Sequence, residues 1–206
     1  MSERTDNGRL EAFCDAIFAI AITLLVLEIH VPDVAAVGPS VSLGALLAEE
    51  WPSWFSFLLT FLTLFIAWTN HHHALAQMDK TSSPFIYANG FLMLTVVIFP
   101  FSAGLLGRFL DTESARLAIL LYCLTNLVHN VGWLALFQVA RKPVSLAKDA
   151  DRHHRIERTA RVVGYTLLLN IAIVALAFFF PVVALVLVTT AWLFYLFAGL
   201  FWTSIA

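Results

Sequence analysis

The residues best placed to do chemistry stand at the start of the first long apolar run. Arg9, Glu11 and Asp15 precede or enter it within the segment Arg9-Leu10-Glu11-Ala12-Phe13-Cys14-Asp15. A carboxylate beside a membrane-crossing helix can bind a cation, carry a proton or pair with an arginine. A charge at the centre of such a helix costs about 2.5–3.5 kcal/mol unless it is partnered. Asp15 lies within the first turns, so an ion pair or cap at the start of the helix is the alternative to a functional site.

The residues after Asp15 form an apolar helix face that carries one hydroxyl group. At 100° per residue, Ala16, Ile20, Thr23 and Leu27 fall within about 60° of one another, and Asp15 points about 140° away from Ile20. If this stripe faced a pore, Ile20 and Leu27 would form apolar rings around Thr23, and such constrictions gate by dewetting. The alternative is ordinary helix packing, with Thr23 bonded to its own backbone.

The elements that position these residues are membrane-spanning helices. The chain has 206 residues, of which 60% are hydrophobic and 13% charged, and its mean hydropathy is +0.84. Soluble domains carry about 25% charged residues, so a soluble domain is excluded. A bilayer core needs about 20 apolar residues per helix. The chain offers six charge-poor stretches of that length, the last two divided at Pro181, and we expect an all-α, single-domain protein over 1–206 with spans at about 12–31, 52–76, 85–107, 117–140, 162–180 and 182–205.

The charges predict how these spans are oriented. Ten of the 12 Lys and Arg residues fall on one side of the expected bilayer, which places both termini in the cytoplasm of a multi-pass cell-membrane protein. The cytoplasmic connector 141–161 has charges spaced as in a solvated helix that touches lipid headgroups. The opposite side is acidic, with Glu28 and Asp33 nearest the end of the first span. A net charge of −2 and two cysteines argue against a nucleic-acid partner and a disulfide framework.

Polar residues near the inner end of the second span are candidate partners for Arg9 and Asp15. They are Trp68, Asn70 and the triplet His71, His72 and His73. Consecutive helical residues project about 100° apart, whereas zinc ligands on one helix stand three or four residues apart. We therefore expect no metal there. One histidine should bond to the residues around Asp15, and the others should lie at the membrane boundary.

The fourth span carries a second polar group of residues. Asn126, His129 and Asn130 share one face through spacings of three and four. Polar side chains facing lipid are disfavoured, so this face should point into the protein. It serves either as hydrogen-bonded contact between helices or as a relay for protons or ions.

The first span resembles a known family. Arg9, Phe13 and Asp15, at their spacing, are similar to the Arg-x-x-x-Phe-Ser-Asp signature of the transmembrane-175 endolysosomal potassium channels. The following Ala-Ile-Phe-Ala-Ile-Ala-Ile-Thr-Leu-Leu-Val-Leu resembles the prokaryotic members. Cys14 stands where the signature has serine, and because a thiol is a weak donor and acceptor, a hydrogen bond made there should be weaker or absent.

The resemblance implies a homotetramer in which four copies of the first span line a central pore. It places the hydrophobic constriction and the hydroxyl-bearing selectivity position on Ile20 and Thr23, with Leu27 one turn outward. It also implies that the signature residues Arg9 and Asp15 are structural and tie the first span to polar residues of other helices. The family lacks a carbonyl filter loop, and this chain has no Thr-Val-Gly-Tyr-Gly run.

Three classes of function follow, of which a passive, moderately potassium-selective cation channel is the leading one. Its partners would be further copies of itself, the lipid bilayer and potassium ions, with no cofactor beyond the permeant ion. The alternative is a proton-coupled secondary transporter that uses Asp15 and His129, although the first span lacks the Gly or Pro break typical of such carriers. An intramembrane enzyme is disfavoured because no paired acids, Ser/His pair or His-x-x-x-His motif lies within the spans.

Overall fold

The computed structural model describes residues 5–33, 41–78, 81–142 and 146–202. Arg4 and Lys80 of the charge count, residues 143–145 of the connector and the last residues of the sixth expected span lie outside these ranges. The described residues form the following elements: α1 (Thr5–Leu24), the 3₁₀ turn η1 (Leu25–Glu28), α2 (Leu43–Glu49), α3 (Trp51–Ala76), α4 (Ser83–Phe109), α5 (Ala115–Ala140), α6 (Ala150–Ala177) and α7 (Pro181–Trp202).

Six of the described helices are long and apolar enough to cross a bilayer, which confirms the all-α, six-span fold class. The helix bounds differ from those expected, most of all at α6, which begins at Ala150 within the connector. Asp149 caps this helix because its carboxylate accepts a hydrogen bond from the backbone N–H of Arg152 at 2.8 Å. The short helix α2 and the 3₁₀ turn η1 were not expected from the sequence.

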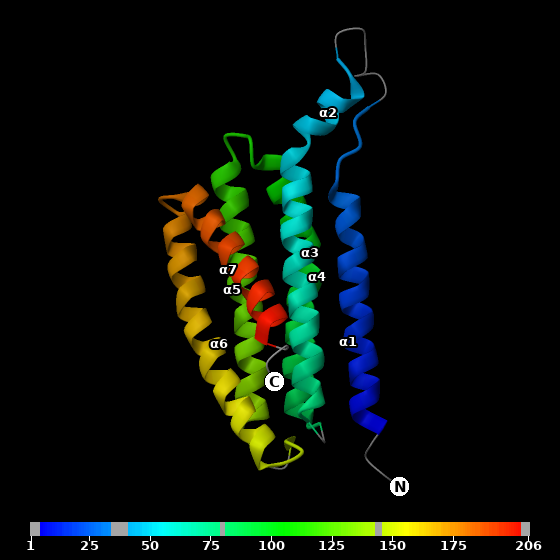
Figure 1. Cartoon of the computed structure of the whole chain (residues 1–206), viewed down its shortest axis with the longest axis vertical. Coiled ribbons are helices and arrows are strands. Elements are labelled where there is room, and N and C mark those ends of the chain that lie inside the picture. The colour runs from blue at the N-terminus through cyan, green and yellow to red at the C-terminus, as the bar shows by residue number, and fades with distance from the viewer. Residues whose placement is uncertain (1–4, 34–40, 79–80, 143–145, 203–206) are drawn as a thin grey trace.

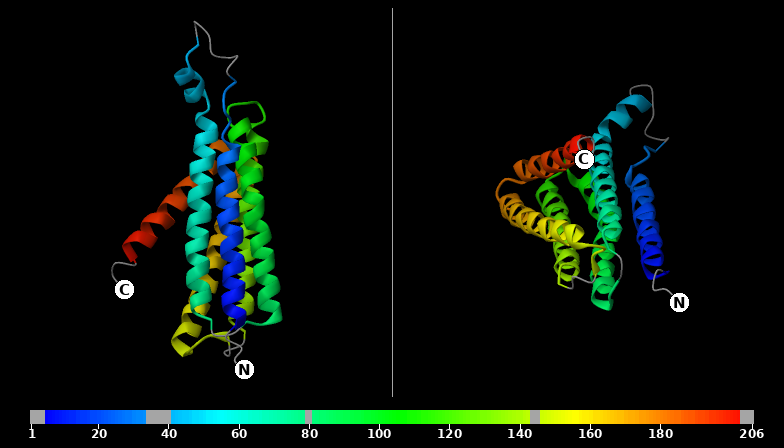
Figure 2. Two further views of the ribbon diagram at one scale, coloured as in Figure 1. Left: turned by 90° about the vertical axis from the view of Figure 1, so that its right-hand side faces the viewer. Right: turned by 60° about the horizontal axis from the view of Figure 1, so that its bottom comes forward.

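The long helices stand side by side, with α1 at one edge and α6 at the opposite edge, and α7 crosses from the α6 edge toward α3 (Figure 1). The N-terminal end of α1, the α3–α4 turn and the α5–α6 connection share one end of the bundle, which we call the N-terminal end. Pro181 begins α7 directly after the short turn that follows Ala177. Helix α7 then leans away from the other helices (Figure 2).

The packed core lies around α4 and α5. One cluster of buried residues joins α1, α3, α4 and α5, and it includes Phe18, Phe85, Phe99 and Trp133. A second cluster joins α3, α4 and α5 to α6 and α7 around Tyr122 and Ile173. Helix α1 packs against α3 and α4, so the first helix is attached to the bundle along one side.

Small residues let α3 and α4 approach closely at the end of the bundle where α2 lies, opposite to the N-terminal end. A Cβ added at Gly107 would lie 2.8 Å from the Ser56 hydroxyl oxygen and 3.0 Å from the Ser53 Cα. Close approach at small residues is a main source of helix association in membranes, where the lipid tails are as apolar as the helices. The contact therefore depends on the missing side chain at Gly107.

Replacing Gly107 by alanine should destabilise the protein. Because the backbone of Ser53 cannot move as a flexible side chain could, overpacking of this kind costs about 1–3 kcal/mol. Gly90→Ala on the same helix is the matched control, since nothing lies within 4 Å of a Cβ added there. Thermal unfolding in detergent should give a lower midpoint for Gly107→Ala and an unchanged or higher midpoint for Gly90→Ala. Equal midpoints would contradict the close α3–α4 contact.

Candidate functional site

Helix α1 has one buried face and one uncovered face. Cys14, Phe18 and Ala21 are buried against the bundle. On the other side, the exposed fractions of Phe13, Ile20 and Leu27 are 59%, 59% and 71%. We call the uncovered residues Phe13, Ala16, Ile20 and Thr23 of α1, together with Leu27 of η1, the α1 stripe; all are exposed in the single chain. The stripe carries no charged side chain.

Small residues lie on and beside the α1 stripe. Ala12, Ala16 and Ala19 are also exposed. In membrane proteins, small residues are enriched where helices meet other helices rather than lipid. The uncovered side of α1 therefore has the composition of a surface that packs against further protein.

The hydroxyl group of Thr23 donates to the carbonyl oxygen of Ile20 at 2.9 Å. This is the bond to its own backbone that the packing interpretation expects. It does not remove the hydroxyl from the stripe, because the oxygen keeps its lone pairs as acceptors after its proton is donated. Thr23 can therefore still present an oxygen ligand on the uncovered face.

A hydrogen bond anchors the buried side of α1 to α3. The indole N–H of Trp68 donates to the Asp15 carboxylate at 2.9 Å, and both side chains are partly buried. A hydrogen bond to an ionised acceptor is about twice as strong as one between neutral groups. The carboxylate is thus satisfied within its own chain, on the side of α1 away from Ile20.

The three consecutive histidines have three different environments. His71 is buried and lies 2.8 Å from the amide oxygen of Asn89 through its Nε2. His72 is exposed and pairs with Glu11 of α1 at 3.0 Å. His73 is exposed and lines a cavity on the far side of α3. The triplet therefore does not converge on one point in the described part of the chain.

Asn89 of α4 is a site residue that sequence reasoning missed. Its amide oxygen faces both His71 of α3 and, at 3.9 Å, the Cys14 thiol of α1. The long distance to sulfur agrees with the weak bond expected for Cys14. The ring of Phe18 also contacts His71, with ring centroids 5.6 Å apart. The signal in the sequence was a lone amide within an otherwise apolar span, which must point into the protein.

The structure does not bring Arg9 and Phe13 into this network. Both side chains are exposed, and no hydrogen bond or ion pair to Arg9 is found among the described residues. Asn70, another candidate partner, lies in the lining of the cavity beyond α3 instead. Of the expected set, only Asp15 and Trp68 bond to each other directly, while Cys14 and His71 meet through Asn89.

The two expected mouth residues lie differently from each other. Asp33 is exposed. Glu28 is half-buried, and its carboxylate fills the space beside Gly104 of α4, where any Cβ would overlap it. Glu28 therefore holds η1 against α4 instead of projecting freely from the end of α1.

A second polar network lies inside the bundle. His129 is buried between Thr95, whose hydroxyl oxygen is 2.8 Å from its Nδ1, and Trp133, whose indole N–H donates to its Nε2 at 3.0 Å. The Thr95 hydroxyl donates to the Leu92 carbonyl oxygen, so the proton on His129 belongs on Nδ1. Both ring nitrogens of a neutral imidazole are then used.

The comparisons of this chain with known proteins agree on one family. The sequence profile of the family described as "Endosomal/lysosomal potassium channel TMEM175" matches residues 9–100. A potassium channel from Chamaesiphon minutus is 40% identical over 152 residues, which cover 73% of this chain and 74% of that protein. A potassium channel from Streptomyces collinus is 30% identical over 176 residues, covering 82% and 84%.

The fold agrees with a solved structure. The crystal structure of a lysosomal potassium-selective channel TMEM175 homolog from Chamaesiphon minutus superposes with a TM-score of 0.85 at 31% sequence identity. The superposition covers 94% of this chain and 97% of that chain. The likeness therefore extends well beyond the segment that the family profile matches.

Removing the indole donor should loosen α1. Trp68→Phe leaves the half-buried Asp15 carboxylate without its donor, and losing a hydrogen bond to a charged group costs about 1.5–3 kcal/mol. Trp54→Phe on the same helix is the matched control, because Trp54 is 43% exposed. Thermal unfolding in detergent should show a lower midpoint for Trp68→Phe than for Trp54→Phe. The anchor has no structural importance if the two variants unfold alike.

Proposed function

The chain belongs to the TMEM175 family, and we propose that it conducts potassium ions passively through a pore lined by α1. The family and its named relatives are ion channels, which removes the intramembrane enzyme from consideration. The observation that carries the proposal is the α1 stripe: an uncharged, uncovered helix face at the edge of the bundle, on a helix whose Asp15 carboxylate is bonded to Trp68 of α3.

The proposed assembly is a homotetramer with the four α1 helices around the central axis. One helix cannot enclose a pore, so several copies of the same face are required. The position of α1 at the edge of the chain supports this arrangement (Figure 1). The exposed alanines beside the stripe also support it, because they allow neighbouring helices to approach closely.

The proposed gate consists of the rings of Ile20 and Leu27. A narrow apolar ring excludes water unless it widens, and an ion cannot cross it without water or a substitute ligand. Thr23 lies between these rings on the stripe, and its oxygen keeps acceptor capacity. Four such oxygens would replace part of the hydration shell of a potassium ion. Selectivity of this kind is moderate, because the ion is only partly dehydrated.

The proposed orientation places both termini in the cytoplasm of a multi-pass protein of the cell membrane. The basic α6 segment around Arg155 and Arg158 lies at the N-terminal end of the bundle, together with the start of α1. Basic residues are retained on the cytoplasmic side. The other end carries Asp33, Glu49 and Glu50, and a negative outer mouth raises the local concentration of cations.

The alternative of a proton-coupled transporter is not favoured. Its two titrating residues would be Asp15 and His129, but Asp15 accepts the Trp68 hydrogen bond and both ring nitrogens of His129 have partners. They also belong to separate networks, one between α1 and α3 and the other between α4 and α5. Neither side chain faces the stripe on which a substrate would move.

Thr23→Ala should lower the selectivity for potassium over sodium. Removing the hydroxyl oxygen removes the polar ligand of the apolar constriction, so the permeability ratio should fall by about twofold or more. Thr190→Ala is the matched control, since Thr190 is an exposed threonine of α7 whose hydroxyl also bonds to its own backbone.

The measurement is a planar-bilayer recording under opposing potassium and sodium gradients, on purified protein whose mass in detergent has been determined. Discrete current steps from a particle of four chains support the proposal. A particle of fewer chains, or uptake that saturates and follows a pH gradient, contradicts it. An unchanged ratio in Thr23→Ala would remove Thr23 from the selectivity position.

A further inference from the structure

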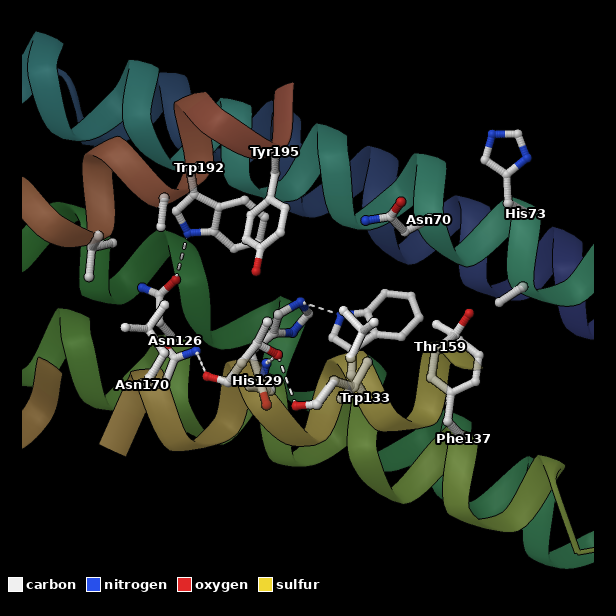
Figure 3. A pocket seen from close by; sticks show the side chains of 18 of the residues that line it. Asn70, His73, Asn126, His129, Trp133, Phe137, Thr159, Asn170, Trp192 and Tyr195 are labelled. Atoms are coloured by element: carbon white, nitrogen blue, oxygen red, sulfur yellow. Dashed lines mark hydrogen bonds between the residues drawn. The ribbon is translucent and has the colours of Figure 1, made fainter. Parts of the chain in front are cut away.

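A cavity of about 370 Å³ lies between α3, α5, α6 and α7 (Figure 3). Helices α5, α6 and α7 lie on one side of α3 and α1 lies on the other (Figure 1). Pockets for drug-sized molecules occupy about 300–1,000 Å³. Aromatic rings from α5 and α7 form much of its wall, among them Trp133, Phe137, Trp192 and Tyr195. The α1 stripe takes no part in the lining.

The cavity also offers hydrogen-bonding groups that the chain leaves unused. The Asn130 amide of the lining is already used, because it donates to Thr166 of α6 at 2.7 Å. The Tyr195 hydroxyl points across the cavity from α7, and the Asn70 amide lies at its edge (Figure 3). A ligand that carries both a donor and an acceptor can therefore bond to the Tyr195 hydroxyl and the Asn70 amide.

The lining selects the chemistry of the ligand. No Asp, Glu, Lys or Arg is among the described residues of the wall, so an ionic ligand would lose its hydration without a counter-charge. An acyl chain would offer no hydrogen bond to the Tyr195 hydroxyl or the Asn70 amide. A neutral molecule with an aromatic ring and a carboxamide group suits this lining, because the amide supplies a donor and an acceptor and the ring stacks on the aromatic wall.

One wall residue connects the cavity to α1. Trp133 donates to His129, and its ring lies against His71 with centroids 6.2 Å apart. His71 in turn shares the Asn89 oxygen with Cys14 of α1. A ligand stacked on Trp133 therefore contacts a chain of packed side chains that ends on the pore-lining helix.

We propose that this cavity binds a neutral aromatic carboxamide and that its occupation changes conduction through Trp133, His71 and Asn89. The effect on conduction rests on the proposed function, whereas the binding does not. Because the cavity lies on the other side of α3 from α1, the ligand acts without entering the pore and without competing with permeant ions.

Photolabelling of the full chain in liposomes tests the binding. The probe is 4-benzoylbenzamide, which is neutral, aromatic and photoreactive, and the charged analogue 4-benzoylbenzoate serves as its matched control. Irradiation followed by peptide mapping should place the label on lining segments of α5, α6 and α7. Ala191→Phe, which fills the cavity from α7 without removing a polar group, should abolish the label. Leu193→Phe, two residues away and 40% exposed, should leave it unchanged.

Potassium flux from the same liposomes tests the modulation. The probe should change the flux of the wild type and of Leu193→Phe at least about twofold, and should leave Ala191→Phe unaffected. Label spread over exposed residues such as Tyr165 and Phe194, equal in all variants, would overturn the binding site. Cavity-specific label with unchanged flux would overturn the modulation. A wild type without any potassium flux would instead refute the proposed function, while the labelling pattern would still decide the binding.

Discussion

The rotation of α1 about its own axis is the constraint on which the proposed function depends, and the Asp15–Trp68 hydrogen bond sets it. A carboxylate near a membrane span must be satisfied by the protein, and at 2.9 Å the Trp68 indole does so from α3. Asp15 and Ile20 point about 140° apart on a helix. Holding Asp15 toward α3 therefore turns Ile20 away from α3. Thr23, about 80° from Asp15 and on the same side of it as Ile20, is exposed with Ile20. The bond made by Asp15 therefore determines which apolar face of α1 is exposed.

The remaining helices support this arrangement. Cys14 and His71 meet at Asn89, which ties α1 to α3 and α4 at the same depth as the anchor. Glu28 seats η1 beside Gly104 at the other end, so both ends of α1 are held against α4. The α5–α7 half of the chain contributes a separate polar interior and a cavity. The Trp133 ring of this half contacts His71 of α3. The cavity lining includes no residue of the α1 stripe.

Much of this arrangement could be predicted from the sequence. Uninterrupted apolar length gave the six helices, Pro181 marked the last turn, and helical spacing separated Asp15 from the stripe. The rest depends on which faces meet. Asn89 bonds His71 only because α3 and α4 are antiparallel neighbours in this register. The Glu28 carboxylate fits beside α4 only because Gly104 has no side chain. The spacing of residues within one helix does not show which faces of different helices meet. It also does not show the cavity left where α7 leans away from the bundle.

Water accessibility along α1 tests the central claim most directly. The native cysteines are buried, so single cysteines can be introduced at Thr23 and Leu27. Ala21, on the buried face of the same helix, is the matched control position. A positively charged methanethiosulfonate reagent applied during potassium conduction should block Thr23→Cys and Leu27→Cys and leave Ala21→Cys conducting. Block at Ala21→Cys with no effect at Thr23→Cys would mean that the other face of α1 lines the path, and the account would be wrong.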